Sequence, residues 1–219
     1  MRFLSYNIHI LSYLNFNIEK KFSGAVIGID EVGRGPLAGP VVSCACIFFD
    51  YSIEQSQLFL FDDSKKLTIK KRCEAFHKVY QLKKDNKLQF ALGFVNVVEI
   101  DKFNILEATK ISMRRAVQKL HYDKANLIID GKIDLQLPQF PSKGIVKGEQ
   151  KSYSIATASI IAKMHRDRYM HYLSLKYPHY DWEKNAGYGT KKHIEQIYKN
   201  GITDHHRKSF KPIKALIHK

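Results

Sequence analysis

The segment 28–36 (GIDEVGRGP) constrains the fold of this chain more than any other stretch of the sequence. It follows a short apolar run that is typical of a buried strand, and it places two acids, Asp30 and Glu31, where that strand ends. Adjacent strand residues point to opposite faces of a sheet, so the two carboxylates can serve one site only if the strand bends or stops between them. The glycines that follow permit such a bend. Taken alone, the two acids are more simply interpreted as a polar strand end that leads into a turn.

Hydrophobic patterns in the rest of the chain predict a mixed α/β fold. Apolar runs predict later strands at 41–49, 87–98, 127–129 and 144–146, and helical spacing predicts a helix that starts near Thr68, a long helix over about 152–176 and another near 191–199. Asn104, with Glu107 three residues later, is expected to cap a further helix that buries Leu106, Met113, Val117 and Leu120. This order predicts a five-stranded mixed sheet flanked by helices, with a C-terminal helical extension.

The chain is expected to have three regions. Residues 1–23 are predicted to be a poorly specified N-terminal extension, either an extra edge strand or a frayed terminus; 24–180 form the main domain, and 181–219 form a helical, basic extension. Asn and His residues interrupt the apolar residues of 1–23, and no small-residue cleavage site follows them. We therefore expect neither a signal peptide nor a membrane span.

The charge of the chain favours a polyanionic partner. The formal net charge is +15, which indicates nucleic acid first and an anionic membrane second, although general lysine enrichment is the alternative explanation. The cysteines, Cys44, Cys46 and Cys73, are an odd and sparse set, which argues against both a disulfide framework and a zinc site. Cys44 and Cys46 alternate along an apolar run, so we expect both to face one side of a buried strand. A reducing, cytoplasmic location is the simplest interpretation.

Three predicted strands end in acids, which are Asp30 with Glu31, then Asp130, then Glu149. Strand ends gather along one edge of a compact sheet, so these four carboxylates could converge. Four acids held together repel one another, and hard divalent cations would relieve that repulsion. Two such ions could orient an attacking water and stabilise the leaving oxygen in phosphodiester hydrolysis. The alternative for Asp130, which precedes a glycine, is an ordinary turn.

Two further features are interpreted as structural. The sequence HRD at 165–167 is similar to a kinase catalytic loop, but it lies within a helical pattern, where Lys163 and Asp167 are predicted to form a surface pair at i and i+4. His205 and His206 could bind a metal, yet adjacent histidines without a partner cluster are more often surface residues. We therefore predict that both lie on the surface.

The motifs of the chain resemble those of the ribonuclease HII family, the type 2 ribonucleases H of bacteria. They are DEVGRGPLAG at 30–39, DSKKL at 63–67, IDG at 129–131, KG at 147–148, SIIAKMHRD at 159–167, GYGT at 187–190 and HHRKSF at 205–210. DEVGRG together with DSKKL is highly specific, whereas IDG or GYGT alone would be weak. The resemblance covers about 25–212, nearly the whole chain.

The resemblance implies a ribonuclease H-like catalytic domain and an endonuclease that acts on RNA in RNA–DNA hybrids. It also implies cleavage on the 5′ side of single ribonucleotides embedded in duplex DNA, with two Mn²⁺ or Mg²⁺ ions and with 3′-hydroxyl and 5′-phosphate products. Asp30, Glu31 and Asp130 correspond to metal-binding catalytic carboxylates. Glu149 stands where the family has Asp, and its extra methylene can change the spacing or the preference for the metal.

The resemblance also assigns residues to the substrate. Gly33, Arg34 and Gly35 correspond to the turn that recognises the ribonucleotide, where backbone groups can approach the 2′-hydroxyl without side-chain obstruction. Tyr188 corresponds to the tyrosine that packs on the neighbouring deoxyribose, although a tyrosine in a glycine-rich loop could merely fill a turn. Phosphate contacts are expected from Ser64, Lys65, Lys66 and Lys147, with solvated loop charges as the alternative.

These features together predict a cytoplasmic, monomeric endonuclease in ribonucleotide excision repair. Its expected partners are RNA–DNA hybrids and ribonucleotide-containing duplex DNA, without a membrane. Two alternatives stay open: another two-metal nuclease on the same fold, and a catalytically silent hybrid-binding protein, which the glutamate at position 149 makes conceivable.

Overall fold

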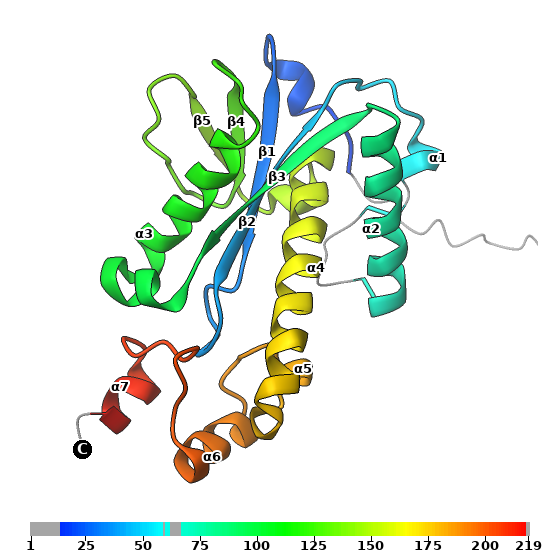
Figure 1. Cartoon of the computed structure of the whole chain (residues 1–219). Coiled ribbons are helices and arrows are strands. Elements are labelled where there is room, and N and C mark those ends of the chain that lie inside the picture. Colours follow the sequence, from blue (N-terminus) through cyan, green and yellow to red (C-terminus); the bar gives the residue numbers. More distant parts are fainter. Residues whose placement is uncertain (1–13, 59, 62–66, 218–219) are drawn as a thin grey trace, which may run out of the picture.

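A five-stranded mixed sheet forms the centre of the molecule (Figure 1). The computed structural model describes residues 14–58, 60–61 and 67–217 of the 219-residue chain. The strands are β1 (Val26–Val32), β2 (Val41–Phe48), β3 (Leu88–Val95), β4 (Asn126–Asp130) and β5 (Ser142–Ile145), in the order β3-β2-β1-β4-β5. Strand β1 is antiparallel to β2 and parallel to β4, and β4 is parallel to β5. The predicted mixed five-stranded sheet is confirmed.

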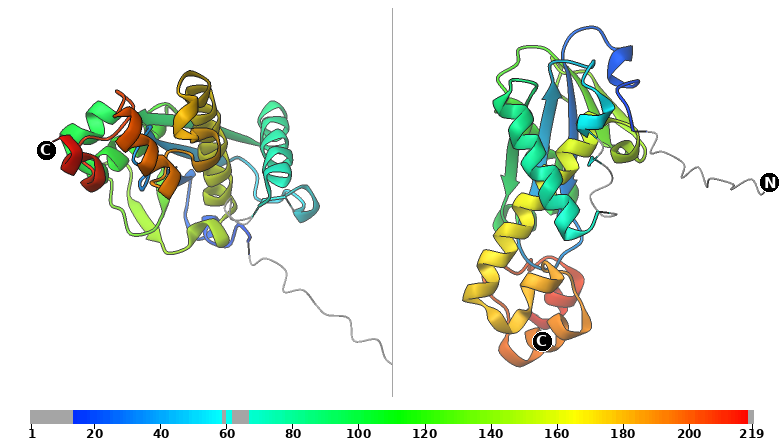
Figure 2. Two further views of the ribbon diagram at one scale, coloured as in Figure 1. Left: turned by 90° about the horizontal axis from the view of Figure 1, so that it is seen from below. Right: turned by 90° about the vertical axis from the view of Figure 1, so that its right-hand side faces the viewer.

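Helices cover both faces of the sheet, and the C-terminal helices gather beyond one end of it (Figure 2). The helices are α1 (Gln55–Leu58), α2 (Ile69–Lys84), α3 (Val97–Gln118), α4 (Tyr153–Lys176), α5 (Trp182–Asn185), α6 (Lys191–Asn200) and α7 (Lys211–Ile217). Three short 3-10 turns, η1 (Glu19–Lys21), η2 (Gly148–Gln150) and η3 (Pro178–Tyr180), complete the described elements. Helix α3 packs on one face, and α2 and α4 pack on the other. No helix in the described part of the chain is both long and apolar enough to cross a bilayer.

The alternation of strand β2 explains why the sheet has a core on each face. Cys44 and Cys46 are fully buried in the cluster that contains α2 and α4, as their spacing predicts. Ala45 and Ile47, between and after them, belong to the cluster that contains α3. All eight residues of β2 are buried, so this strand is the middle of the core.

Helix α4 lies unusually close to strand β1 because Gly28 has no side chain. A Cβ atom at this position would lie 2.4–2.6 Å from atoms of Ser154 and Ile155. The predicted start of α4 is confirmed: Ser152 is its N-cap, and its hydroxyl accepts a hydrogen bond from the backbone N–H of Ile155 at 3.1 Å. The close approach positions the first turns of α4 directly against the strand that ends in the two acids.

Helix α3 begins earlier than the sequence predicts. A capping box between Asn96 and Glu99 opens it at Val97, and a kink at Asn104, with φ of 64°, joins two helical segments. The predicted cap is confirmed for the second segment, because the Asn104 side chain accepts hydrogen bonds from the backbone N–H groups of Leu106 and Glu107 at 2.9 and 3.2 Å. Leu106 is 48% exposed, so the prediction that it is buried is wrong.

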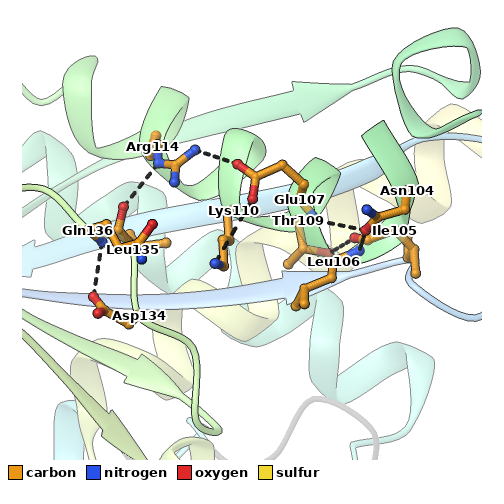
Figure 3. A network of polar contacts seen from close by, with 10 residues as sticks. All are labelled: Asn104, Ile105, Leu106, Glu107, Thr109, Lys110, Arg114, Asp134, Leu135 and Gln136. Carbon is orange, nitrogen blue, oxygen red and sulfur yellow. Dashed lines mark hydrogen bonds and ion pairs between the residues drawn. The ribbon is translucent and has the colours of Figure 1, made fainter. Parts of the chain in front are cut away.

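A polar network ties α3 to the loop between β4 and β5 (Figure 3). Arg114 donates to the Glu107 carboxylate at 2.7 Å and to the carbonyl oxygen of Leu135 at 3.0 Å. Within the loop, Asp134 accepts a hydrogen bond from the backbone N–H of Gln136 at 2.9 Å. The loop that follows the acid-bearing end of β4 is therefore fixed to the body of the domain.

The described part of the N-terminal extension packs into the core. Leu14 and Phe16 are 1% and 5% exposed, and the Phe16 ring contacts the rings of Tyr51 and Tyr153 with centroids 5.0 Å apart. Among residues 14–23, the segment forms a β-bridge between Asn15 and Ser152 and no strand, and residues 1–13 of the predicted extension lie outside the described residues. The domain boundaries at 23/24 and 180/181 stay predictions.

Candidate active site

Sheet topology brings the carboxyl ends of β1, β4 and β5 to one edge. The three strands run in the same direction, so the acids that end or follow them lie along this edge. Ile29 pairs with Ile129, which places Asp30 and Asp130 next to each other at the same level of neighbouring strands. Residues at one level of neighbouring strands share a face of the sheet, so both side chains leave on the α4 side.

Asp30 is the most deeply buried of these acids, with 7% of its surface exposed. Burial raises the pKa of Asp30 well above its ordinary value, and the negative charges of Glu31 and Asp130 raise it further. A hydrogen bond from the Ser159 side chain on α4 and another from the backbone N–H of Glu31, at 2.7 Å, act in the opposite direction. The part of this effect that comes from the charges of Glu31 and Asp130 is the repulsion that a cation would relieve.

Asp130 holds the turn that contains Glu149. Its Oδ1 atom accepts a hydrogen bond from the backbone N–H of Gly148 at 2.7 Å. Lys147, just before the turn, has a left-handed backbone with φ of 55°, which reverses the chain after β5. Glu149 is consequently turned into the molecule and is 8% exposed, while Lys147 is exposed.

Glu31 occupies a different position from Asp30. Strand β1 neither bends nor stops between the two acids but continues in register to the pair of Val32 with Val42. The Glu31 side chain is only partly exposed, and its Oε1 atom accepts a hydrogen bond from Arg34 at 3.2 Å. The expected bend between the two acids is absent from the described backbone, yet the charge of Glu31 acts on Asp30 more strongly than that of Asp130 does, so the two carboxylates lie close enough to interact.

The acids fit a hard divalent cation by their chemistry, because the donors are all carboxylate oxygens that repel one another. Their side chains do not form a complete metal-coordination site in this structure. In the described ranges, no group of three or more His, Cys, Asp or Glu side chains is placed so that it could hold a metal ion.

Two buried arginines hold the loop 33–40, which follows β1. Arg166, on α4, donates to the carbonyl oxygens of Ala38 and Pro40 at 3.0 and 2.9 Å. Arg207 makes five hydrogen bonds to four carbonyl oxygens of the loop, which belong to Gly33, Arg34, Gly39 and Pro40. Both side chains are fully buried, and no carboxylate within the described residues forms a salt bridge with either of them.

Burial lowers the pKa of both guanidinium groups. The pKa of Arg166 falls to about 10, and that of Arg207 falls to about 9, where the neighbouring positive charge of Arg166 contributes as well. Backbone dipoles are thus the main partners of two adjacent buried charges. Such an arrangement is costly unless the hydrogen bonds are well formed, so it fixes the loop in one conformation.

The hydrogen bonds from Arg207 set the direction of the peptide groups in the turn 33–35. Gly33 has φ of +93°, a conformation that favours glycine. The carbonyl groups of Gly33 and Arg34 point inward to Arg207. In a trans peptide the N–H group is opposite the carbonyl group, so the N–H groups of Arg34 and Gly35 point outward. Neither N–H has a protein acceptor among the described residues.

Tyr188 lies beside this turn, although it is far away in sequence. A Cβ atom on Gly35 would be 3.3 Å from the Tyr188 ring. The ring is held there because the backbone N–H of Leu37 donates to the carbonyl oxygen of Gly187 at 2.8 Å. Tyr188 is 47% exposed, so its ring is open to a ligand at the edge of the turn.

A buried histidine pair supports the Tyr188 loop from behind. His193 Nδ1 lies 2.8 Å from the Tyr188 carbonyl oxygen, and His193 Nε2 accepts a hydrogen bond from Trp182 at 3.0 Å. His206 Nε2 lies 3.2 Å from the same His193 nitrogen, and His206 Nδ1 accepts from the backbone N–H of Thr203 at 2.9 Å. Burial lowers the pKa of His193, and it lowers that of His206 to about 3, so both rings are neutral at pH 7.

The prediction that both adjacent histidines lie on the surface is wrong for His206, which is 1% exposed. It packs against the rings of Tyr180 and Trp182, whose centroids lie 4.9 and 5.3 Å from its own. His205 is partly exposed. The predicted surface pair of Lys163 and Asp167 is confirmed, with 2.7 Å between the charged atoms.

The sequence interpretation missed Arg166 and Arg207 as residues that support the site. A signal for Arg166 was available, because it continues a buried helical stripe on α4 that consists of Ala162, Arg166, Met170 and Leu173. An arginine on such a stripe indicates a buried partner. The short motif around Arg207 has no comparable periodicity. Of the expected phosphate contacts, Ser64, Lys65 and Lys66 lie outside the described residues.

The sheet order and the flanking helices define a protein with the ribonuclease H-like fold. The crystal structure of ribonuclease H2 from Pyrococcus horikoshii OT3 superposes with a TM-score of 0.71 at 21% identity and covers 89% of this chain and 98% of its own. The crystal structure of Bst-RNase HIII in complex with Mn²⁺ superposes with a TM-score of 0.62 at 20% identity, over 90% of this chain and 70% of its own.

Sequence comparison defines the family within this fold. The Ribonuclease HII family model matches residues 27–213. Ribonuclease HII of Wolbachia sp. subsp. Brugia malayi (strain TRS) is 45% identical over 203 residues, which is 93% of this chain and 96% of the relative. The chain belongs to the ribonuclease HII family and is an endonuclease of the ribonuclease H type.

Proposed function

We propose that this enzyme hydrolyses RNA in RNA–DNA hybrids and nicks duplex DNA on the 5′ side of single embedded ribonucleotides. The observation that supports this most strongly is the adjacency of two structures at one sheet edge. The turn 33–35 presents outward N–H groups, and the strand directly before it contains Asp30 beside Asp130. A ribose bound at the turn would have its phosphodiester next to the acids.

The residues of the turn and the loop supply recognition in this proposal. The outward N–H groups of Arg34 and Gly35 can donate to a ribose hydroxyl or a phosphate oxygen, which lets the enzyme distinguish RNA from DNA. The exposed Tyr188 ring can pack on the sugar of the next nucleotide. Arg34 and Lys147 are cationic and exposed, so they suit contacts with the phosphate backbone.

We assign Asp30, Glu31, Asp130 and Glu149 as the residues that hold two divalent cations, Mn²⁺ or Mg²⁺. The all-oxygen donor set supports this assignment, as does the Mn²⁺ complex of the related RNase HIII. When bound, such ions activate water and stabilise the leaving oxygen of a phosphodiester. The products would be a 3′-hydroxyl and a 5′-phosphate. We further propose that the enzyme acts as a monomer in the cytoplasm, in ribonucleotide excision repair.

A cleavage assay with a matched pair of variants tests the proposal. The substrate is a DNA duplex with one ribonucleotide, incubated with Mn²⁺ or Mg²⁺. Asp130→Asn removes a carboxylate at the sheet edge, and Asp134→Asn removes an exposed one from the next loop. We expect one nick 5′ to the ribonucleotide from the wild type and from Asp134→Asn, and at least a hundredfold less from Asp130→Asn.

Two other outcomes would contradict the proposal in different ways. Cleavage of an all-DNA duplex at a similar rate would indicate a general two-metal nuclease. Binding of the hybrid without metal-dependent cleavage would indicate a silent hybrid-binding protein.

A further inference from the structure

Glu19 is a fully buried carboxylate in the short turn η1, within the N-terminal segment. No Lys, Arg or His of the described residues lies within salt-bridge distance of it. A buried acid without a cationic partner is costly unless hydrogen bonds and local dipoles offset the cost. The hydrogen-bond partners of Glu19 therefore indicate the role of this buried carboxylate.

The partners of Glu19 lie at the start of helix α4. Its Oε1 atom accepts hydrogen bonds from the Ser152 hydroxyl at 2.7 Å and from the backbone N–H of Ser154 at 3.1 Å. The first N–H groups of a helix lack partners within the helix and have a positive partial charge, so a carboxylate is favourable there. Glu19 and Ser152 together satisfy the first turn of α4, because Ser152 also accepts from Ile155.

Ser152 connects Glu19 to the acids at the sheet edge. The backbone N–H of Ser152 donates to the carbonyl oxygen of Gly148 at 3.0 Å. The N–H of Gly148 in turn donates to Asp130 at 2.7 Å. The turn that contains Glu149 is thus held at one end by Asp130 and at the other by Ser152, whose hydroxyl is held by Glu19.

We propose that Glu19 is a positioning residue that fixes the turn 148–150 and thereby sets Glu149 relative to Asp130. This inference rests on the proposed role of those acids, and it assigns the N-terminal segment to the active site. Glu19 acts through Ser152 and does not contact the substrate. The amide of a glutamine has an oxygen that can accept the same two hydrogen bonds, whereas alanine leaves the Ser152 hydroxyl and the Ser154 N–H without this partner.

The test compares Glu19→Ala with Glu19→Gln in the full chain. Hydrogen exchange is measured in the metal-free protein over residues 146–154, and Mn²⁺ binding is measured by calorimetry without substrate. We expect faster exchange in this segment for Glu19→Ala and Mn²⁺ binding about tenfold weaker, as for lost support of a metal ligand. For the single-ribonucleotide duplex, kcat should fall by about tenfold with KM within about twofold. Glu19→Gln should stay within about threefold of the wild type in each measurement.

Val79→Ala is the control for lost stability, because Val79 is a fully buried apolar residue on α2 and takes no part in this hydrogen-bonded series. It should lower the unfolding temperature without changing Mn²⁺ binding or exchange at 146–154. Ser152→Ala provides the same comparison if Glu19→Ala does not fold, and it should weaken Mn²⁺ binding while Glu19 is retained.

The inference is overturned if Glu19→Ala, or Ser152→Ala in its place, binds Mn²⁺ and exchanges at 146–154 like the wild type. It is also overturned if Val79→Ala weakens Mn²⁺ binding as much. A failure of the proposed function is distinguishable, because it would show as a wild-type protein that does not cleave the ribonucleotide duplex at all.

Discussion

Replacement of Arg207 by lysine tests whether the hydrogen bonds that hold the loop 33–40 control recognition of the ribonucleotide. Arg207 donates five hydrogen bonds to four loop carbonyl groups from a fully buried position. A lysine ammonium has three donors, and the neutral amine has two. The variant therefore leaves at least one carbonyl without a partner when charged and at least two when neutral. Each loss costs about 1–3 kcal/mol in a buried site.

The charge state of the lysine gives this prediction its pH dependence. Burial and the charge of Arg166 lower the pKa of Arg207 from its usual value to about 9. The same environment would lower the pKa of a lysine at this position well below its ordinary value of about 10.4. The buried lysine therefore loses its charge at a lower pH than an exposed one, while arginine remains charged. A base that binds fewer protons when folded than when unfolded makes the folded state more stable as the pH rises through its folded-state pKa toward about 10.

The assay measures cleavage of a single-ribonucleotide duplex from pH 6 to 8.5, as the ratio of Arg207→Lys to the wild type. We expect this ratio to fall by about tenfold as pH rises, because about 1–2 kcal/mol of loop contacts is lost. The thermal stability of the variant relative to the wild type should rise over the same range. Arg115→Lys is the control, because Arg115 is paired with Glu99 at 2.6 Å and is partly exposed, so its replacement stays charged. An activity ratio that does not change with pH would refute the reasoning.

Two further predictions concern the packing of α4 on β1 and the exposed ring of Tyr188. Gly28→Ala places a methyl group within 2.6 Å of the backbone of α4, so the free energy of unfolding in urea should fall by about 3 kcal/mol; a loss below about 1 kcal/mol would show that α4 can move away easily. Tyr188→Ala should weaken cleavage at single ribonucleotides more than cleavage within long RNA stretches, measured on matched duplexes. Equal losses on both substrates would remove Tyr188 from the recognition of the junction.

Local patterns were enough to predict most elements of the fold. Thr68 and Ser152 were correctly predicted to start helices, because an N-cap acts on N–H groups only two or three residues away. The alternation of Cys44 and Cys46 predicted a shared face, because strand periodicity is also local. At α3 two local signals competed: the cap at Asn104 was recognised, but the capping box at Asn96 opens the helix first.

The motifs predicted which acids belong to the site, and the sheet topology then placed them. The parallel pairing of β1 with β4 sets Asp30 beside Asp130. No local pattern predicts this pairing, because the two strands are far apart in the sequence.

The sequence by itself determined the periodic elements, the acids and the glycine-rich turn, because each depends on interactions within a few residues. Only the tertiary structure decided how these parts are held. Arg207 clamps a loop that lies about 170 positions earlier in the chain, and Glu19 caps a helix 133 positions later. Such partners meet only when the whole core closes, and the same closure removes water from charged groups that would otherwise be expected on the surface.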